Sequence, residues 1–159
     1  MKNIKIKRAV VSVFDKTNLN LLADYFIKND IQVLSTGGTF NFLKKYSKNI
    51  NLTEIANFTK FNEILGGRVK SLHPYIHSGI LAKKGDLAHK RELEKISVPF
   101  VDLVVVNLYP FEKVINETNS TKEKCIENID IGGPTLIRSA AKNYENVTIL
   151  SEPSQYELF

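Results

Sequence analysis

The sequence predicts an α/β fold in which helices flank a mostly parallel sheet. Short apolar runs, the clearest at residues 101–107, are typical of strands that are buried on both faces. Between these runs, apolar residues recur at helical spacing, first at Leu19, Leu22, Ala23 and Phe26. Strands that alternate with helices favour a parallel sheet, which binds ligands beyond the carboxyl ends of its strands.

The expected elements follow one another along the chain without repeats or a flexible linker. We expect strands at residues 9–13, 31–34, 52–55, 101–107 and 147–150. We expect helices that begin at Leu19 and that span residues 39–46, 58–65, 87–96, 122–128 and 134–142. Asp15 or Thr17 is expected to cap the first helix. Residues 75–81 are ambiguous between a helix and a strand.

The composition indicates one globular domain. The chain has 159 residues, of which 43% are hydrophobic and 25% are charged, and we expect residues 1–159 to form the domain. These values exclude disorder, collagen and a coiled coil. The longest apolar stretch, at residues 101–108, is interrupted by Asp102 and Asn107, so no segment reaches the ~20 apolar residues of a membrane helix.

Cysteine content and charge narrow the class of protein further. The chain has a single cysteine, Cys125, which excludes an internal disulfide and a cysteine-based zinc site. This cysteine usage indicates a reducing cytoplasm. We expect Cys125 to be a small buried packing residue. The net charge is +5, which raises the possibility of nucleic-acid binding. The lysines are scattered, however, and a phosphorylated small molecule would also use positive charge that is concentrated in one pocket.

The segment STGGT at residues 35–39 follows an expected strand and opens an expected helix. Free N–H groups, hydroxyls and the helix dipole at such a turn suit a phosphate. The alternative is a plain glycine turn with a Ser or Thr cap. Lys16 follows another strand, at a helix start where a cation opposes the dipole, and it is either a ligand-binding group or a solvated lysine.

A second candidate segment, at residues 66–74, combines cations with an imidazole. Arg68 and Lys70 share one side if this stretch is extended, which fits an anionic ligand. His73 and His77 have zinc-like spacing, but Pro74 can only open a helix, so His73 lies outside it. We therefore expect structural histidines and no metal site.

Two further segments follow expected strands or open a helix. Asn107 and Tyr109 can donate to a substrate oxygen, or they are a turn residue and a packing residue. At residues 128–135, two glycines free backbone N–H groups at a helix start. On that helix, polar residues recur at helical spacing and form one stripe: Thr135, Arg138, Ser139 and Lys142. This stripe either faces a ligand or is simply a solvated helix face.

Six segments occur together in one order. They are SVFDKT (12–17), STGGT (35–39), GRVKSLHP (67–74), VVVNLYPF (104–111), NIDIGGP (128–134) and RSAAKN (138–143). In these segments the chain closely resembles the N-terminal domain of the bifunctional purine-biosynthesis enzymes that combine AICAR transformylase with inosine monophosphate (IMP) cyclohydrolase. The resemblance covers nearly the whole chain.

The resemblance implies a methylglyoxal-synthase-like (MGS-like) three-layer fold, a homodimer and a cytosolic location. It implies that FAICAR (5-formamido-imidazole-4-carboxamide ribotide) closes to IMP with loss of water, in the last step of IMP synthesis. It also implies that no metal or organic cofactor takes part. We expect no nucleic-acid and no membrane partner.

The resemblance also implies two groups of site residues. The catalytic group is Lys142, Lys70, Asp130, Tyr109 and Asn107, with Lys142 as the proton-transfer lysine. The substrate-binding group comprises the phosphate loop and its neighbours, the cationic motif and a strand-end backbone: Ser12, Lys16, Ser35, Thr36, Gly37, Gly38, Thr39, Arg68, Ser71, Ile131 and Gly132. Two positions depart from the family pattern, Phe14 where serine is frequent and Ser71 where threonine is usual.

The family's chain continues far beyond residue 159, so we expect this chain to be a truncated cyclohydrolase domain. The transformylase domain, which uses 10-formyltetrahydrofolate, is then absent. A phosphate-sensing regulatory module of the same fold is the alternative function, and it would not need Lys70, Asn107 and Lys142. Methylglyoxal synthase would need aspartates near its phosphate loop, and none lies between Gln32 and Asn51.

Overall fold

The structure is a computed structural model that describes residues 5–159. It contains a parallel five-stranded sheet with the strand order β3-β2-β1-β4-β5. The strands are β1 (Arg8–Val13), β2 (Gln32–Ser35), β3 (Leu52–Glu54), β4 (Leu103–Asn107) and β5 (Thr148–Leu150). The predicted α/β class with a parallel sheet is therefore confirmed.

The central strands β1 and β4 are buried because their side chains are almost all apolar. Val10, Val11, Val104 and Val105 have no exposed surface. Such strands must be covered by helices on both faces. The register pairs Val13 with Asn107, so both strands end at the same level and open onto one edge of the sheet.

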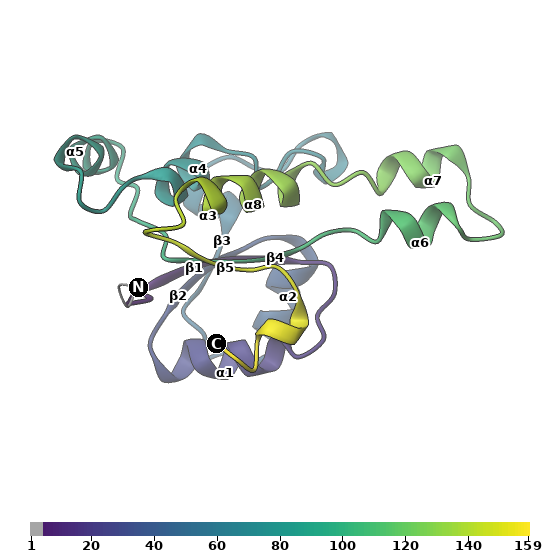
Figure 1. Ribbon diagram of the computed structural model, residues 1–159, viewed down its shortest axis with the longest axis horizontal. Coiled ribbons are helices and arrows are strands. Elements are labelled where there is room, and N and C mark those ends of the chain that lie inside the picture. Colours follow the sequence, from purple (N-terminus) through teal and green to yellow (C-terminus); the bar gives the residue numbers. More distant parts are fainter. Residues whose placement is uncertain (1–4) are drawn as a thin grey trace.

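Helices cover the two faces and produce three layers (Figure 1). Helix α1 (Leu19–Lys28) and helix α2 (Gly37–Tyr46) pack on one face, where Phe26 and Leu43 are buried. On the other face lie α3 (Ile55–Thr59), α4 (Pro74–Leu81) and α8 (Gly132–Lys142), which bury Ile76 and Leu136 among other residues. Helix α5 (Leu87–Lys95) packs through Leu93 beside this layer.

Two short helices project from the sheet edge as an arm (Figure 1). They are α6 (Phe111–Ile115) and α7 (Lys122–Glu127), and residues 108–131 are referred to below as the α6–α7 arm. Helix α6 was not predicted, because its five residues are too few to show a periodic apolar stripe. Two 3-10 turns were also missed, Leu65–Gly67 and Pro153–Gln155.

The predicted helix at residues 58–65 is wrong. Helix α3 ends at Thr59, and Lys60 has a φ of 58°, in the left-handed region. The Thr59 hydroxyl donates to the Ile55 carbonyl and accepts from the Phe61 amide, so it closes the helix where the periodicity suggested that one would begin. The ambiguous residues 75–81 belong to α4, and Pro74 opens that helix with His73 outside it, as expected.

The predicted cap of the first helix is also wrong. Asn18, with a φ of 59°, precedes α1, and its side chain makes no capping hydrogen bond. The Asp15 carboxylate instead accepts from the amide and the hydroxyl of Thr17 at 2.9 and 2.7 Å. Asp15 therefore stabilises the turn ahead of the helix rather than the helix itself.

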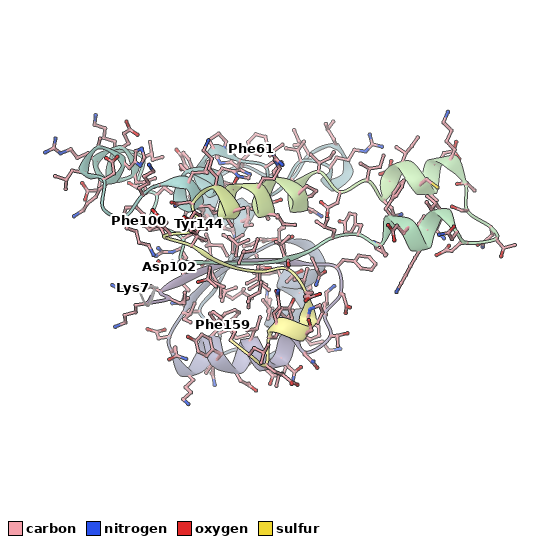
Figure 2. All side chains as sticks on the ribbon, viewed as in Figure 1. Lys7, Phe61, Phe100, Asp102, Tyr144 and Phe159 are labelled. Atoms are coloured by element: carbon pink, nitrogen blue, oxygen red, sulfur yellow. The ribbon has the colours of Figure 1, made fainter. Side chains whose placement is uncertain are left out.

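A buried carboxylate organises the amino ends of the strands. Asp102 accepts hydrogen bonds from the backbone amides of Lys7 and Arg8 at 2.8 and 2.9 Å (Figure 2). Lys84 approaches its other oxygen at 2.5 Å. No helix within residues 5–159 combines the length and the hydropathy that crossing a membrane requires.

Candidate functional site

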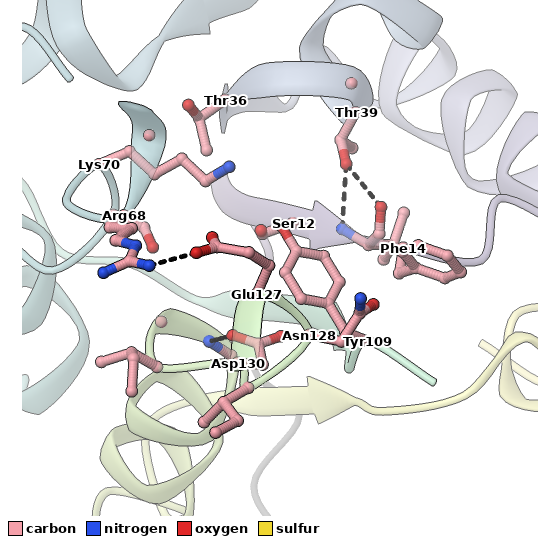
Figure 3. Close-up of a pocket in the computed structure, with 18 of the residues that line it drawn as sticks. Ser12, Phe14, Thr36, Thr39, Arg68, Lys70, Tyr109, Glu127, Asn128 and Asp130 are labelled. Carbon is pink, nitrogen blue, oxygen red and sulfur yellow. Dashed lines mark hydrogen bonds and ion pairs between the residues drawn. The ribbon is translucent and has the colours of Figure 1, made fainter. Parts of the chain in front are cut away.

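A cavity of about 680 Å³ opens at the carboxyl ends of β1, β2 and β4, where parallel sheets bind ligands (Figure 3). Its wall is completed by the α6–α7 arm and by the loop that precedes α4. The predicted site residues that line it are Ser12, Lys16, Thr36, Gly38, Thr39, Arg68, Lys70, Ser71, Asn107, Tyr109, Asp130, Ile131 and Gly132.

Two lysine side chains converge on the first turn of α2. Lys70 Nζ lies 3.6 Å from the point that a Cβ on Gly37 would occupy, and Lys16 Nζ lies 3.7 Å from the corresponding point on Gly38. The amino end of a helix is already positive, so two ammonium groups there are unfavourable unless an anion lies between them. This end of the cavity is suited to a phosphate.

The three hydroxyls of the STGGT segment point in different directions. Ser35 is fully buried, and its Oγ donates to the Val11 carbonyl at 2.7 Å, so its side chain does not line the cavity. Thr39 Oγ1 is bonded to the Val13 backbone. Thr36 precedes α2, and its side chain makes no capping hydrogen bond in the described part of the chain. Thr36 itself lines the cavity.

The opposite end of the cavity is the start of α8. Asp130 Oδ1 accepts a hydrogen bond from the Gly133 amide at 2.7 Å and so caps the helix. A Cβ on Gly132 would lie 2.6 Å from Ser71 Oγ, and a Cβ on Gly133 would collide with Leu108. Gly132 therefore allows the helix to approach Ser71 in the loop before α4, and Gly133 allows it to approach Leu108 directly after β4.

A charged pair joins the two walls of the cavity. The Arg68 guanidinium contacts the Glu127 carboxylate at the end of α7 (Figure 3). Hydrogen bonding to Glu127 raises the pKa of Arg68 above its ordinary value. Sequence reasoning missed Glu127, although it directly precedes the NIDIGGP segment, because nothing in its spacing relates it to Arg68.

Asn107 and Tyr109 both lie in the cavity wall, but their side chains have different partners. Asn107 Oδ1 accepts from the amides of Phe14 and Asp15, and its Nδ2 donates to the Asp15 carbonyl. Asn107 thus has the contacts of a turn residue. The ring of Tyr109 packs edge-on against Phe14, with the centroids 5.5 Å apart.

Lys142 is not brought to the cavity. It is exposed in the last turn of α8, ten residues after Gly132, which corresponds to ~15 Å along a helix. The polar stripe on this helix is partly structural, because Thr135 Oγ1 donates to the Gly132 carbonyl and Ser139 Oγ contacts His77 Nδ1. The geometry of one chain thus separates Lys142 from the other predicted catalytic residues.

The histidines and the cysteine have structural surroundings. His73 Nδ1 accepts from the Tyr75 amide. Burial lowers the pKa of His77, and its Nε2 has no hydrogen-bond partner among residues 5–159. Cys125 is half-buried beside Ser120, not fully buried as predicted. Within residues 5–159, no three His, Cys, Asp or Glu side chains gather as a metal site would require.

Comparison with known protein families shows that residues 18–135 of this chain match the family described as the MGS-like domain. The chain belongs to the MGS-like domain family. Its fold is thus that of an MGS-like domain, as the sequence resemblance implied. The MGS-like segment contains α2, the cationic loop and the start of α8, which line much of the cavity, while Ser12 and Lys16 lie before this segment.

Related proteins extend well beyond this MGS-like domain. The bifunctional purine biosynthesis protein PurH of Lactobacillus acidophilus is 49% identical over 96% of this chain and 29% of its own length. PurH of Leptospira biflexa is 47% identical over 98% of this chain and 30% of its own. The chain therefore spans under a third of the length of these curated relatives. The crystal structure of ForH has a TM-score of 0.80 and 33% identity, and the match covers 96% of this chain and 77% of that one.

Proposed function

We propose that this MGS-like domain is an IMP cyclohydrolase of de novo purine biosynthesis, which closes FAICAR to IMP. The observation that carries the proposal is the convergence of Lys16 and Lys70 on the glycines that open α2, at one end of a cavity whose other end is polar. The names of the PurH relatives support the pathway. The cavity of about 680 Å³ is of a size suited to a small ligand.

In the proposed reaction the carboxamide nitrogen bonds to the formyl carbon. One proton from each of the two nitrogens leaves with the formyl oxygen as water. Both reacting groups belong to one molecule, so binding in the correct orientation supplies much of the rate enhancement. Lys16, Lys70 and Thr36 anchor the phosphate at α2, which fixes the distance from the phosphate to the reacting groups.

The start of α8 is the polar end that suits the reacting groups. The Gly132 backbone and the Ser71 hydroxyl lie close together in the cavity lining, and their proposed role is to stabilise negative charge on the formyl oxygen. Asp130 uses Oδ1 for the helix cap, which leaves Oδ2 to accept from the carboxamide. Tyr109 lies in the cavity wall and is the proposed proton-transfer group, whereas the Lys70 ammonium, at the α2 end, is assigned to the phosphate.

A spectroscopic assay of FAICAR cyclisation by this chain tests the proposal. We expect turnover that IMP inhibits competitively. Binding of IMP without any turnover would instead favour a phosphate-sensing regulatory module, which needs the α2 end of the cavity but not the α8 end. Failure to bind either nucleotide would overturn both.

We further propose, from the family resemblance, that the domain forms a homodimer and acts in the cytosol. Sedimentation velocity over a range of concentrations tests the assembly. A monomer at all concentrations would contradict it.

A further inference from the structure

The turn that follows β1 is held from two sides by residues distant in sequence. Thr39 Oγ1 accepts from the Val13 amide at 3.0 Å and donates to the Val13 carbonyl at 2.9 Å (Figure 3). From β4, Asn107 Oδ1 accepts from the amides of Phe14 and Asp15 at 2.7 and 2.9 Å, and its Nδ2 donates to the Asp15 carbonyl at 2.8 Å. These bonds fix three successive residues of the turn.

The same turn carries Lys16. Its ammonium folds back and donates to the Phe14 carbonyl at 3.1 Å, and it lies 3.5 Å from the Val13 carbonyl. From this position it reaches the first turn of α2 at Gly38. The location of the Lys16 charge therefore depends on the conformation of the residues that Thr39 and Asn107 hold.

The bonding capacity of Thr39 leaves nothing to donate to an anion. A hydroxyl has one proton, and that of Thr39 is used on Val13. Asn107 uses both acceptor sites of Oδ1 and one of its two N–H groups. Both side chains border the cavity, yet their hydrogen bonds are directed to the backbone of the turn.

We propose that Thr39 and Asn107 are positioning residues that place the Lys16 ammonium at the phosphate end of the cavity. This inference rests on the proposed function, because it takes the occupant of that end to be the phosphate of a nucleotide. It reassigns two residues that the sequence resemblance implied to contact the substrate. A bulky change at either position acts through Lys16 rather than through a lost contact with the ligand.

A double-mutant cycle between Asn107 and Lys16 tests the proposal, with IMP as the probe and calorimetry as the readout. Asn107→Ala is expected to weaken IMP binding about tenfold, the factor that corresponds to one net hydrogen bond. In a Lys16→Gln background the same change is expected to have almost no further effect, because the positioned charge is already gone. An equal effect in both backgrounds would overturn the proposal.

Matched variants separate positioning from general destabilisation. Thr59→Val removes a buried hydroxyl that is bonded like that of Thr39, and Asn143→Ala removes a buried amide that donates to the carbonyls of Ile80 and Ala82. Both lie outside the cavity, so both should lower the melting temperature without changing IMP affinity. Thr39→Val should weaken binding, and Thr39→Ser should restore it.

One readout does not depend on the proposed function. A ligand-free crystal structure of Asn107→Ala should show the Lys16 ammonium displaced from the Phe14 carbonyl. An unmoved turn would overturn the positioning role even if the wild-type domain binds IMP. Absence of IMP binding by the wild type would instead contradict the proposed function, and the crystal structure would still decide the positioning role.

Discussion

Lys70 Nζ lies 3.6 Å from the point that a Cβ on Gly37 would occupy, and Gly37 has a φ of +55°. A side chain at this position would therefore be strained by the backbone, and its Cβ would be in van der Waals contact with the ammonium. The left-handed turn at the start of α2 and the space beside the Lys70 ammonium thus both involve Gly37.

Gly37→Val is expected to weaken IMP binding and to cost about 1–2 kcal/mol of the free energy of unfolding, because the left-handed conformation disfavours a Cβ. Gly85→Ala is the control, since in the described part of the chain no atom lies within 4 Å of its added Cβ. Calorimetric titration with IMP and urea unfolding measure the two effects. Unchanged IMP affinity in a folded Gly37→Val protein would show that the loop is only a turn.

The two lysines that the family resemblance places in catalysis should behave differently. Lys70→Gln is expected to weaken FAICAR binding by ~10–100-fold, the factor that corresponds to one lost hydrogen bond to a charged group, and to slow cyclisation at low FAICAR concentration accordingly. Lys142→Gln should leave turnover nearly unchanged, because Lys142 is exposed at the far end of α8. Single-turnover rates with FAICAR distinguish the variants. A large loss of turnover in Lys142→Gln would contradict this expectation, and would indicate that Lys142 acts in a cavity other than that of its own chain.

Tyr156 should make stability sensitive to alkaline pH. Burial raises its pKa to about 12, whereas an unfolded tyrosine titrates near ~10. A raised pKa in the folded state contributes stability that is complete below the unfolded value and is lost as the pH rises towards the folded value. The free energy of unfolding should therefore fall between ~pH 10 and pH 12.

Tyr156→Phe is the matched control for that titration. The buried Tyr156 hydroxyl has no hydrogen-bond partner among residues 5–159, so its removal should not destabilise the protein at neutral pH. The variant should also show a smaller loss of stability at alkaline pH. Urea unfolding at pH 8 and at alkaline pH, for both proteins, makes the comparison. An identical pH dependence in the two proteins would assign the effect to other groups.

Asp102 is expected to be a strong determinant of stability at the end of the sheet opposite the cavity. Asp102→Ala leaves the backbone amides of Lys7 and Arg8 and the Lys84 ammonium without their buried acceptor, which should cost about 3 kcal/mol. Asp86→Ala, which removes the exposed cap of α5, should cost about 1 kcal/mol. Chemical unfolding measures both. Equal losses would show that Asp102 contributes no more than a surface cap.

The fold was predictable where a single physical signal governed an element. The valine-rich strands and the apolar stripe of α1 are recognisable in the sequence. A strand that is buried on both faces is a continuous apolar run, whereas a helix that is buried on one face has apolar residues at helical spacing. The end of α3 was not predictable, since it depends on the left-handed Lys60 and on the bonds of the Thr59 hydroxyl. A pattern of apolar residues carries no information about such local competition.

The location of the site was predictable, but the direction of its side chains was not. Glycines after strands and cations in loops indicate where a ligand binds. Whether the hydroxyls of Ser35 and Thr39 face the ligand or the β1 backbone depends on the strand register, which pairs Val11 with Ser35. The pairing of Arg68 with Glu127 spans 59 residues and depends on how the α6–α7 arm folds back.

The α6–α7 arm should exchange its amide hydrogens independently of the sheet. Helices of five and six residues are too short to be stable alone, and the Arg68–Glu127 pair that joins the arm to the opposite wall is exposed. Sub-global opening of the arm therefore requires much less free energy than unfolding of β1 or β4. Because the arm supplies part of the cavity wall, a bound ligand should slow its exchange, and the measured affinity includes the free energy of ordering it.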